Sequence, residues 1–208
     1  MAVSAPSGAR PIRLQASDAL VLVDVQHDFV SGALAVPDAT SALPVLNRYL
    51  REFTRRGLPV FATRDWHPTA HCSFRDRGGP WPPHCIVGTP GAAFAVGLAL
   101  GPDARVVSKA TTIDRDAYSG FEDTDLDLDL RRLAVHRLFV GGLATDYCVR
   151  QTVLDARRLG YEVLLLEDAI RAVNVKPGDG ERAMDEMRAA GAVPIRIDDL
   201  APVEAPHG

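Results

Sequence analysis

The sequence predicts an α/β fold in which a mostly parallel β-sheet lies between two layers of helices. Two observations lead to this prediction. Apolar runs of strand length alternate along the chain with patterns of helical period. The apolar runs are also uninterrupted, as is typical of strands that helices cover on both faces. We therefore expect a three-layer fold.

The first predicted elements form a βαβ unit. A continuous apolar strand covers residues 19–25, and apolar residues then recur at helical spacing over residues 43–53. Gly57 ends this helix, and a second apolar strand covers residues 58–63. Two parallel neighbouring strands joined by one helix are therefore expected at the start of the domain.

The remaining elements continue the alternation. Further strands are predicted at residues 105–108, 138–141, 162–166 and 193–197, and helices at residues 125–134, 145–159 and 178–190. Residues 125–130 alternate Asp and Leu as a strand would, but Leu126, Leu130 and Leu133 share one helical face. Acidic residues also suit a helix N-terminus, so we expect a helix there. Glu167 and Asp168 are expected to end the fifth strand.

Length and composition are those of one compact domain. The chain has 208 residues, of which 47% are hydrophobic and 24% charged. A chain of this length can bury ~70% of its unfolded surface around a single core. We expect a flexible N-terminal tail over residues 1–17, one domain over residues 18–200 and a C-terminal tail over residues 201–208. The first residues lack the apolar segment of a signal peptide.

Charge, hydrophobicity and cysteine content limit the classes of partner and the cellular compartment that we expect. A formal net charge of -4 provides no basic field for a nucleic-acid backbone. The apolar runs are far shorter than the ~20 residues that a membrane helix needs. Three cysteines without a CxxC pair suit a reducing compartment, so we expect a cytoplasmic protein. The expected ligand is a small molecule, with no nucleic-acid and no membrane partner.

A candidate nucleophile follows the fourth predicted strand. The strand runs into a Gly-Gly pair, and Cys148 lies near the start of the next helix. Helix amides and the helix dipole at such a position favour a thiolate over a thiol. Asp24 and Lys109 close the first and third strands, so the same edge of the sheet supplies a base and a cation. The alternative is that Cys148 is a buried, inert cysteine.

The longest irregular segment, residues 65–92, contains a second candidate site. Asp65 and His67 are two residues apart in an extended chain, so their side chains point the same way. His84 follows two prolines that stiffen the backbone. One carboxylate with two imidazoles can hold a metal and leave positions open for water or substrate. A structural zinc site using Cys72 and Cys85 is a weaker alternative, because neither belongs to a CxxC pair.

Five segments together resemble the motifs of the nicotinamidase/pyrazinamidase group of the isochorismatase-like cysteine hydrolases. They are residues 23–29 (VDVQHDF), 65–68 (DWHP), 81–85 (WPPHC), 118–121 (YSGF) and 142–149 (GLATDYCV). The resemblance extends from about residue 19 to residue 197. It implies an isochorismatase-like, flavodoxin-like fold with a sheet of about six strands. It also implies hydrolysis of nicotinamide, and of pyrazinamide-type analogues, to the acid and ammonia in NAD salvage.

The resemblance implies roles for the first group of residues. Asp24, Lys109 and Cys148 would be the catalytic residues, and the reaction would pass through a thioacyl intermediate on the cysteine. Asp24 would take the thiol proton, and Lys109 would keep Asp24 ionised. The backbone N–H groups of Ala144 and Cys148 would form the oxyanion hole, next to a cis peptide bond between Leu143 and Ala144.

The resemblance further implies one divalent metal ion, with zinc preferred and iron or manganese as alternatives. Its ligands would be Asp65, His67 and His84. The fourth, variable position falls on Ser73, with His71 nearby as the alternative. The ion would position the substrate ring over the thiol. The residues expected to contact that ring are Phe29, Leu34, Trp81, Tyr118 and Tyr147.

Two other functions stay open at this point. The first is an amidohydrolase of the same superfamily that acts on a carbamoyl or ureido substrate, although those relatives mostly lack a set like Asp65, His67 and His84. The second is a catalytically silent binding module on the same fold. Nucleotide cofactors are not expected, because no GxGxxG or Walker spacing follows the paired glycines. A homo-oligomer is compatible with the sequence.

Overall fold

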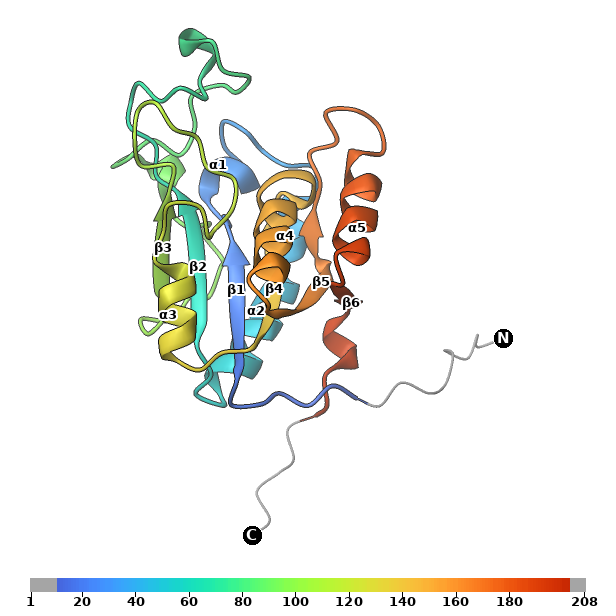
Figure 1. Ribbon diagram of the computed structural model, residues 1–208. Helices are drawn as coiled ribbons and strands as arrows, with labels where there is room; N and C mark the ends of the chain where they lie inside the picture. The colour runs from blue at the N-terminus through green and yellow to red at the C-terminus, as the bar shows by residue number, and fades with distance from the viewer. Residues whose placement is uncertain (1–10, 203–208) are drawn as a thin grey trace.

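Within residues 11–202, which the computed structural model describes, the chain forms a six-stranded parallel sheet between two layers of helices (Figure 1). The strands are β1 (Asp18–Val23), β2 (Val60–Asp65), β3 (Arg105–Lys109), β4 (Arg137–Leu143), β5 (Glu162–Arg171) and β6 (Val193–Ile195). The helices are α1 (His27–Val30), α2 (Ala39–Thr54), α3 (Leu126–Arg132), α4 (Arg150–Arg158) and α5 (Asp179–Ala189). A π-turn at Thr145–Val149 precedes α4, and short 3-10 turns lie at Arg75–Arg77, Pro90–Ala92 and Ile197–Asp199.

The strand order places a ligand-binding edge between β1 and β4. The order is β3-β2-β1-β4-β5-β6, and each neighbouring pair is parallel. After β1, the chain adds β2 and then β3 on one side of the sheet. After β4, it adds β5 and β6 on the other side. The carboxyl ends of β1 and β4 therefore form the topological switch point, where open α/β sheets bind their ligands.

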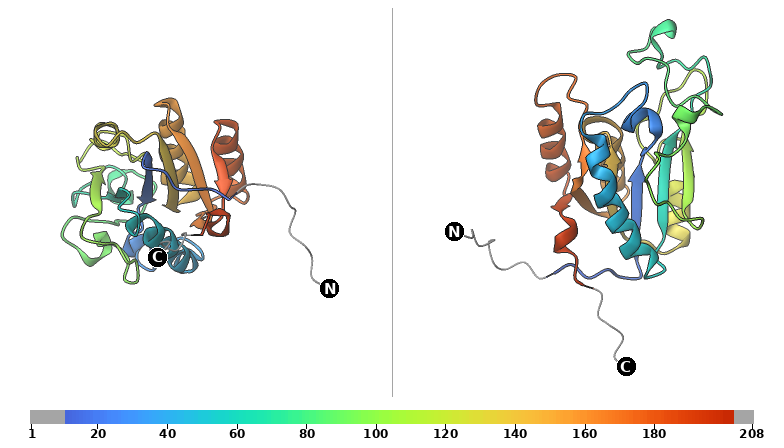
Figure 2. Two further views of the ribbon diagram at one scale, coloured as in Figure 1. Left: turned by 90° about the horizontal axis from the view of Figure 1, so that it is seen from below. Right: turned by 180° about the vertical axis from the view of Figure 1, so that it is seen from behind.

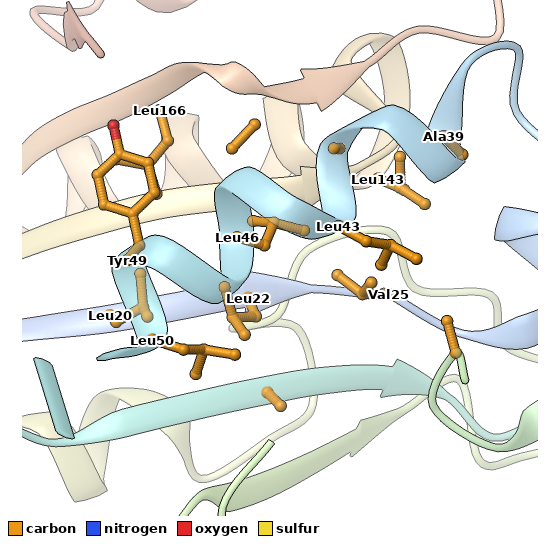
Figure 3. Close-up of a cluster of buried hydrophobic side chains, with 14 of the residues drawn as sticks. Leu20, Leu22, Val25, Ala39, Leu43, Leu46, Tyr49, Leu50, Leu143 and Leu166 are labelled. Atoms are coloured by element: carbon orange, nitrogen blue, oxygen red, sulfur yellow. The ribbon is translucent and has the colours of Figure 1, made fainter. Parts of the chain in front are cut away.

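Apolar periodicity explains why the helices pack where they do. Helix α2 covers one face of the sheet, and α3, α4 and α5 cover the other (Figure 2). In α2, Leu43, Leu46 and Leu50 are buried at helical spacing and lie in one cluster with Leu20 and Leu22 of β1 (Figure 3). Each fully buried leucine side chain contributes about 2 kcal/mol of hydrophobic stabilisation. This packing fixes α2 against β1, the strand whose carboxyl end forms part of the switch point.

The predicted α/β class is confirmed, with differences at the strand ends. Strand β1 ends at Val23, because Asp24 adopts a left-handed backbone (φ 49°) and turns the chain away. Strand β5 does not end at residue 166 as expected. Its pairing with β4 resumes after an irregularity, with Gly142 opposite Ile170, so the strand continues to Arg171. Residues 167 and 168 consequently lie inside the strand and not at its end.

The predicted tails fall largely outside the described residues, which exclude 1–10 and 203–208. Residues 11–17 of the N-terminal segment are described. There the Ile12 N–H donates to the Asp199 carbonyl, and the Ala201 N–H donates to the Ile12 carbonyl, both at 2.8 Å. Over residues 11–202, we find no helix with the length and apolar character needed to cross a bilayer.

Candidate active site

Three polar side chains from three segments meet at the carboxyl edge of the sheet. Asp24 follows β1 directly, Lys109 ends β3, and Cys148 lies in the π-turn after β4. The Lys109 Nζ is 2.9 Å from Asp24 Oδ2 and 3.5 Å from Cys148 Sγ. All three residues are buried. The structure thus brings together the three side chains that the sequence indicates as candidate nucleophile, base and cation.

Lys109 is the central cation of this cluster. Besides Asp24, it forms an ion pair with Asp65 and donates a hydrogen bond to the Ala117 carbonyl at 3.0 Å. Burial opposes the charged ammonium, but the carboxylates of Asp24 and Asp65 outweigh burial and raise the pKa of Lys109 well above its usual value. Lys109 is therefore a permanent positive charge in contact with both the base and the thiol.

Burial raises the pKa of both Asp24 and the Cys148 thiol, and Lys109 opposes the shift in each case. This differs from the expectation that the helix start favours a thiolate. Desolvation is the largest cause for Cys148, and the carboxylates of Asp24 and Asp65 raise its pKa further. The surroundings of Cys148 therefore favour the thiol over the thiolate. Asp24, with its raised pKa, is a stronger base than an ordinary aspartate.

The backbones of β1 and β4 approach each other closely just before the turn that carries Cys148. A Cβ at Gly142 would lie 2.1 Å from the Val23 carbonyl oxygen, and Gly142 has a φ of 122°. Glycine is therefore required for β4 to approach the end of β1 so closely. The expected cis peptide bond between Leu143 and Ala144 is present. Ala144 and Cys148 then line the same cavity, as an oxyanion hole built from their N–H groups requires.

A second cluster, formed by Asp65, His67 and His84, borders the same cavity. The Asp65 Oδ2 atom is 3.4 Å from His67 Nε2 and 3.9 Å from His84 Nε2. One ligand atom from each of the three residues lies within 4.8 Å of the other two. All three side chains are buried. They come from the end of β2 and from the following loop, where a bridge between His67 and Ile86 brings the two imidazoles together.

The hydrogen-bonding state of His67 and His84 fits a bound cation in this cluster. Both ring nitrogens of His67 are buried without a hydrogen-bond partner, which is costly for a polar group unless a ligand satisfies it. The His84 Nδ1 is 2.8 Å from the Pro82 carbonyl, which requires the proton on Nδ1 and leaves Nε2 with a free lone pair. Burial also lowers the pKa of His84, so its imidazole is neutral, as a metal ligand must be.

Ser73, and not His71, lines the cavity beside this cluster. The His71 Nε2 is 3.0 Å from the Arg115 carbonyl, and its Nδ1 is 2.7 Å from Ser73 Oγ. A carbonyl only accepts, so Nε2 carries the proton and Nδ1 accepts from the Ser73 hydroxyl. Both His71 nitrogens are thereby occupied, whereas the Ser73 oxygen keeps lone pairs for the cavity.

The cavity wall is largely aromatic. All five residues expected to contact the substrate ring line it, namely Phe29, Leu34, Trp81, Tyr118 and Tyr147. The Trp81 Nε1 donates to the Tyr118 hydroxyl at 3.0 Å, and both rings pack against Tyr147, at centroid distances of 5.1 and 5.7 Å. Three distant segments thus contribute aromatic rings to the wall of the cavity that Cys148 also lines.

The sequence did not indicate three further residues of the wall: Val36, Asp116 and Val173. Val173 follows the part of β5 beyond the expected strand end, and Val36 lies in a loop without periodicity, so neither gave a signal. Asp116 is two residues before Tyr118. Alternation in an extended segment could have placed the two side chains on the same side.

Comparison with known proteins shows the family to which this chain is similar. Residues 18–199 match the isochorismatase domain. The nicotinamidase of Escherichia coli (strain K12) is 41% identical over 203 residues, which cover 87% of this chain and 95% of that protein. The pyrazinamidase of Pyrococcus horikoshii, solved in complex with zinc, is 50% identical with a TM-score of 0.83, covering 86% of this chain and 99% of that one. PnC1 from L. infantum, solved in complex with nicotinate, is 35% identical with a TM-score of 0.86, covering 92% and 98%.

Proposed function

The chain belongs to the isochorismatase family, and within that family we propose that it is a metal-dependent nicotinamidase. It hydrolyses nicotinamide, and pyrazinamide-type analogues, to the carboxylic acid and ammonia. One observation carries the proposal: the Asp24, Lys109 and Cys148 cluster and a cation-binding cluster open onto one aromatic cavity. Relatives of amidase function with 41% and 50% identity over most of the chain support it.

The proposed chemistry is nucleophilic catalysis by Cys148. Asp24 takes the thiol proton, and the sulfur attacks the amide carbonyl carbon. Asp24 then passes this proton to the departing nitrogen, and ammonia leaves a thioester on Cys148. Asp24 next takes a proton from water, whose oxygen attacks the thioester, and the same proton restores the thiol as nicotinate is released. Each step uses one proton held by one carboxylate.

Lys109 and the backbone provide the electrostatic support. The Lys109 ammonium stabilises the thiolate as it forms, because its Nζ lies 3.5 Å from the sulfur. The N–H groups of Ala144 and Cys148 are the proposed donors to the oxyanion of the tetrahedral intermediate. Such donors act most strongly in a cavity from which water is excluded, and Cys148 is buried at the base of this one.

Asp65, His67 and His84 are the proposed ligands of a divalent cation, zinc in preference to iron or manganese. Ser73 is the fourth residue at this position, acting directly or through water. A bound ion supplies an open coordination position that orients the ring nitrogen of the substrate. The gathering of these three ligands favours nicotinamide over the carbamoyl or ureido substrates of other superfamily members.

The aromatic residues of the cavity wall explain the choice of a flat heterocyclic amide. In the proposed complex, Trp81, Tyr118 and Tyr147 contact the ring together with Phe29 and Leu34, which line the same cavity. The reaction belongs to NAD salvage, because it returns nicotinamide to nicotinate. We place it in the cytoplasm, in keeping with three free cysteines among the described residues, and propose that the chain forms homo-oligomers.

An ammonia-release assay tests the proposal. The purified protein is incubated with nicotinamide, and ammonia and nicotinate are measured over time. We expect stoichiometric formation of both products, no turnover by Cys148→Ala, and normal turnover by Cys72→Ala, which removes a free cysteine outside the cavity. Mass spectrometry of a quenched reaction should show the nicotinoyl adduct on Cys148. Turnover of a ureido substrate but not of nicotinamide would contradict the proposal.

A further inference from the structure

Thr63 is a fully buried residue of β2 whose hydroxyl forms two hydrogen bonds with Asp24. Its Oγ1 is 2.6 Å from Asp24 Oδ1, and the Asp24 backbone N–H points to the same Oγ1 at 3.2 Å. The N–H can only donate, so the hydroxyl accepts from it and gives its single proton to the carboxylate. The direction of both hydrogen bonds is therefore determined.

The hydrogen bond from Thr63 orients the carboxylate of Asp24. Thr63 holds Oδ1, Oδ2 lies 2.9 Å from Lys109 Nζ, and the Asp24 side chain interacts with the Cys148 thiol. Asp24 stands just beyond the end of β1 in a left-handed conformation, and its backbone N–H also reaches the Thr63 carbonyl at 3.2 Å. This backbone contact places the residue but not its carboxylate, which the Thr63 hydroxyl holds from the neighbouring strand.

The side chain of Thr63 is itself locked by Gly120. A Cβ at Gly120 would lie 2.8 Å from Thr63 Cγ2, so the threonine methyl occupies space that only a glycine leaves free. The Gly120 N–H is held in turn by the Thr152 hydroxyl at 2.9 Å. A β-branched side chain packed in this way has one favoured χ1, and its hydroxyl is therefore aimed at Asp24.

We propose that Thr63 is a positioning residue for the reaction: its hydroxyl holds one oxygen of Asp24 so that the other faces the Cys148 thiol. The inference rests on the proposed function, in which Asp24 moves the proton of the thiol. Without the hydroxyl, the carboxylate turns away from the sulfur for part of the time, and proton transfer slows. Substrate binding does not change, because Thr63 does not line the cavity.

Three variants separate this role from a structural one. Thr63→Val keeps the shape and removes the hydroxyl, and Thr63→Ser keeps the hydroxyl and removes the methyl. Tyr49→Phe is the control, because it also removes a hydroxyl that donates to a carboxylate, that of Asp168 at 3.3 Å, from a buried residue outside the cavity. Each protein is measured for kcat and KM with nicotinamide and for Tm. The rate of iodoacetamide alkylation at Cys148 is followed by peptide mass spectrometry, which requires no substrate.

For Thr63→Val we expect kcat to fall about 10- to 100-fold with an unchanged KM, because misplacement of a reacting group has that cost. Cys148 alkylation should slow in the same variant. Thr63→Ser should stay within about threefold of the parent, with the remaining loss due to rotamer freedom. Tyr49→Phe should lower Tm and leave kcat and alkylation unchanged.

Equal losses of kcat in Thr63→Val and Tyr49→Phe, or normal Cys148 alkylation in Thr63→Val, would overturn the inference. Failure of the proposed function is distinguishable, because the parent protein would then not hydrolyse nicotinamide at all. The alkylation rates of the three variants would still report whether Thr63 controls the thiol.

Discussion

Replacing Asp24 with asparagine removes the proposed base with little change of shape. The structure shows how the asparagine fits. Its side-chain oxygen takes the place of Oδ2 at Lys109, and its NH₂ group faces Thr63, whose hydroxyl changes from donor to acceptor. Lys109 keeps its second carboxylate partner, Asp65. We therefore expect Asp24→Asn to fold.

The expected loss of activity follows from the role of the base. A positioned general base contributes about 10²- to 10⁴-fold to the rate, which corresponds to about 3–5 kcal/mol in the activation barrier. Breaking a buried ion pair by removal of one partner costs about 3–5 kcal/mol of folding stability. Because Asp65 still neutralises Lys109, we expect the stability loss of Asp24→Asn at the lower end of that range.

Ammonia release and alkylation together measure this prediction. Turnover of nicotinamide by Asp24→Asn should fall at least 100-fold, an order set by the base contribution, while Cys148 alkylation slows in parallel. Circular dichroism and Tm would establish that the variant is folded. A folded Asp24→Asn protein with a kcat within a few-fold of the parent would refute the assignment of Asp24 as the proton carrier.

Three further predictions concern the cation site, the core and the nucleophile turn. Dialysis against a chelator should abolish turnover, and zinc, iron or manganese added singly should restore it; full activity of metal-free protein would contradict this. Leu46→Ala should cost about 2–5 kcal/mol in the free energy of unfolding by urea, because this fully buried leucine packs between α2 and β1. Gly142→Ala should give little folded protein on expression, since its Cβ would meet the Val23 carbonyl; a soluble variant with a normal Tm would refute this reasoning.

The architecture and the chemical types of the site residues were predictable from local features. Uninterrupted apolar runs mark buried parallel strands, and the residues that follow such strands must meet at one edge of the sheet. The sequence alone therefore indicates Asp24, Lys109 and Cys148. The pairing of Asp65 with His67 followed from the two-residue repeat of an extended chain.

Contacts between distant segments decided the rest. No local pattern could show that Lys109 forms an ion pair with Asp65 as well as with Asp24. Nor could one show that Thr63 donates a hydrogen bond to Asp24 from the neighbouring strand. The continuation of β5, which leads to Val173 in the cavity wall, depends on its pairing with β4. The choice of Ser73 over His71 at the cavity likewise depends on a carbonyl 44 residues from His71 along the chain.

The pKa of Cys148 shows most clearly what the sequence determines and what depends on the tertiary structure. The sequence by itself determined that a cysteine would stand at the start of a helix, because helical and strand periods are properties of neighbouring residues. Only the tertiary structure decided that its pKa is raised and not lowered. A pKa depends on burial and on charges from every surrounding segment, and here desolvation exceeds the attraction of Lys109.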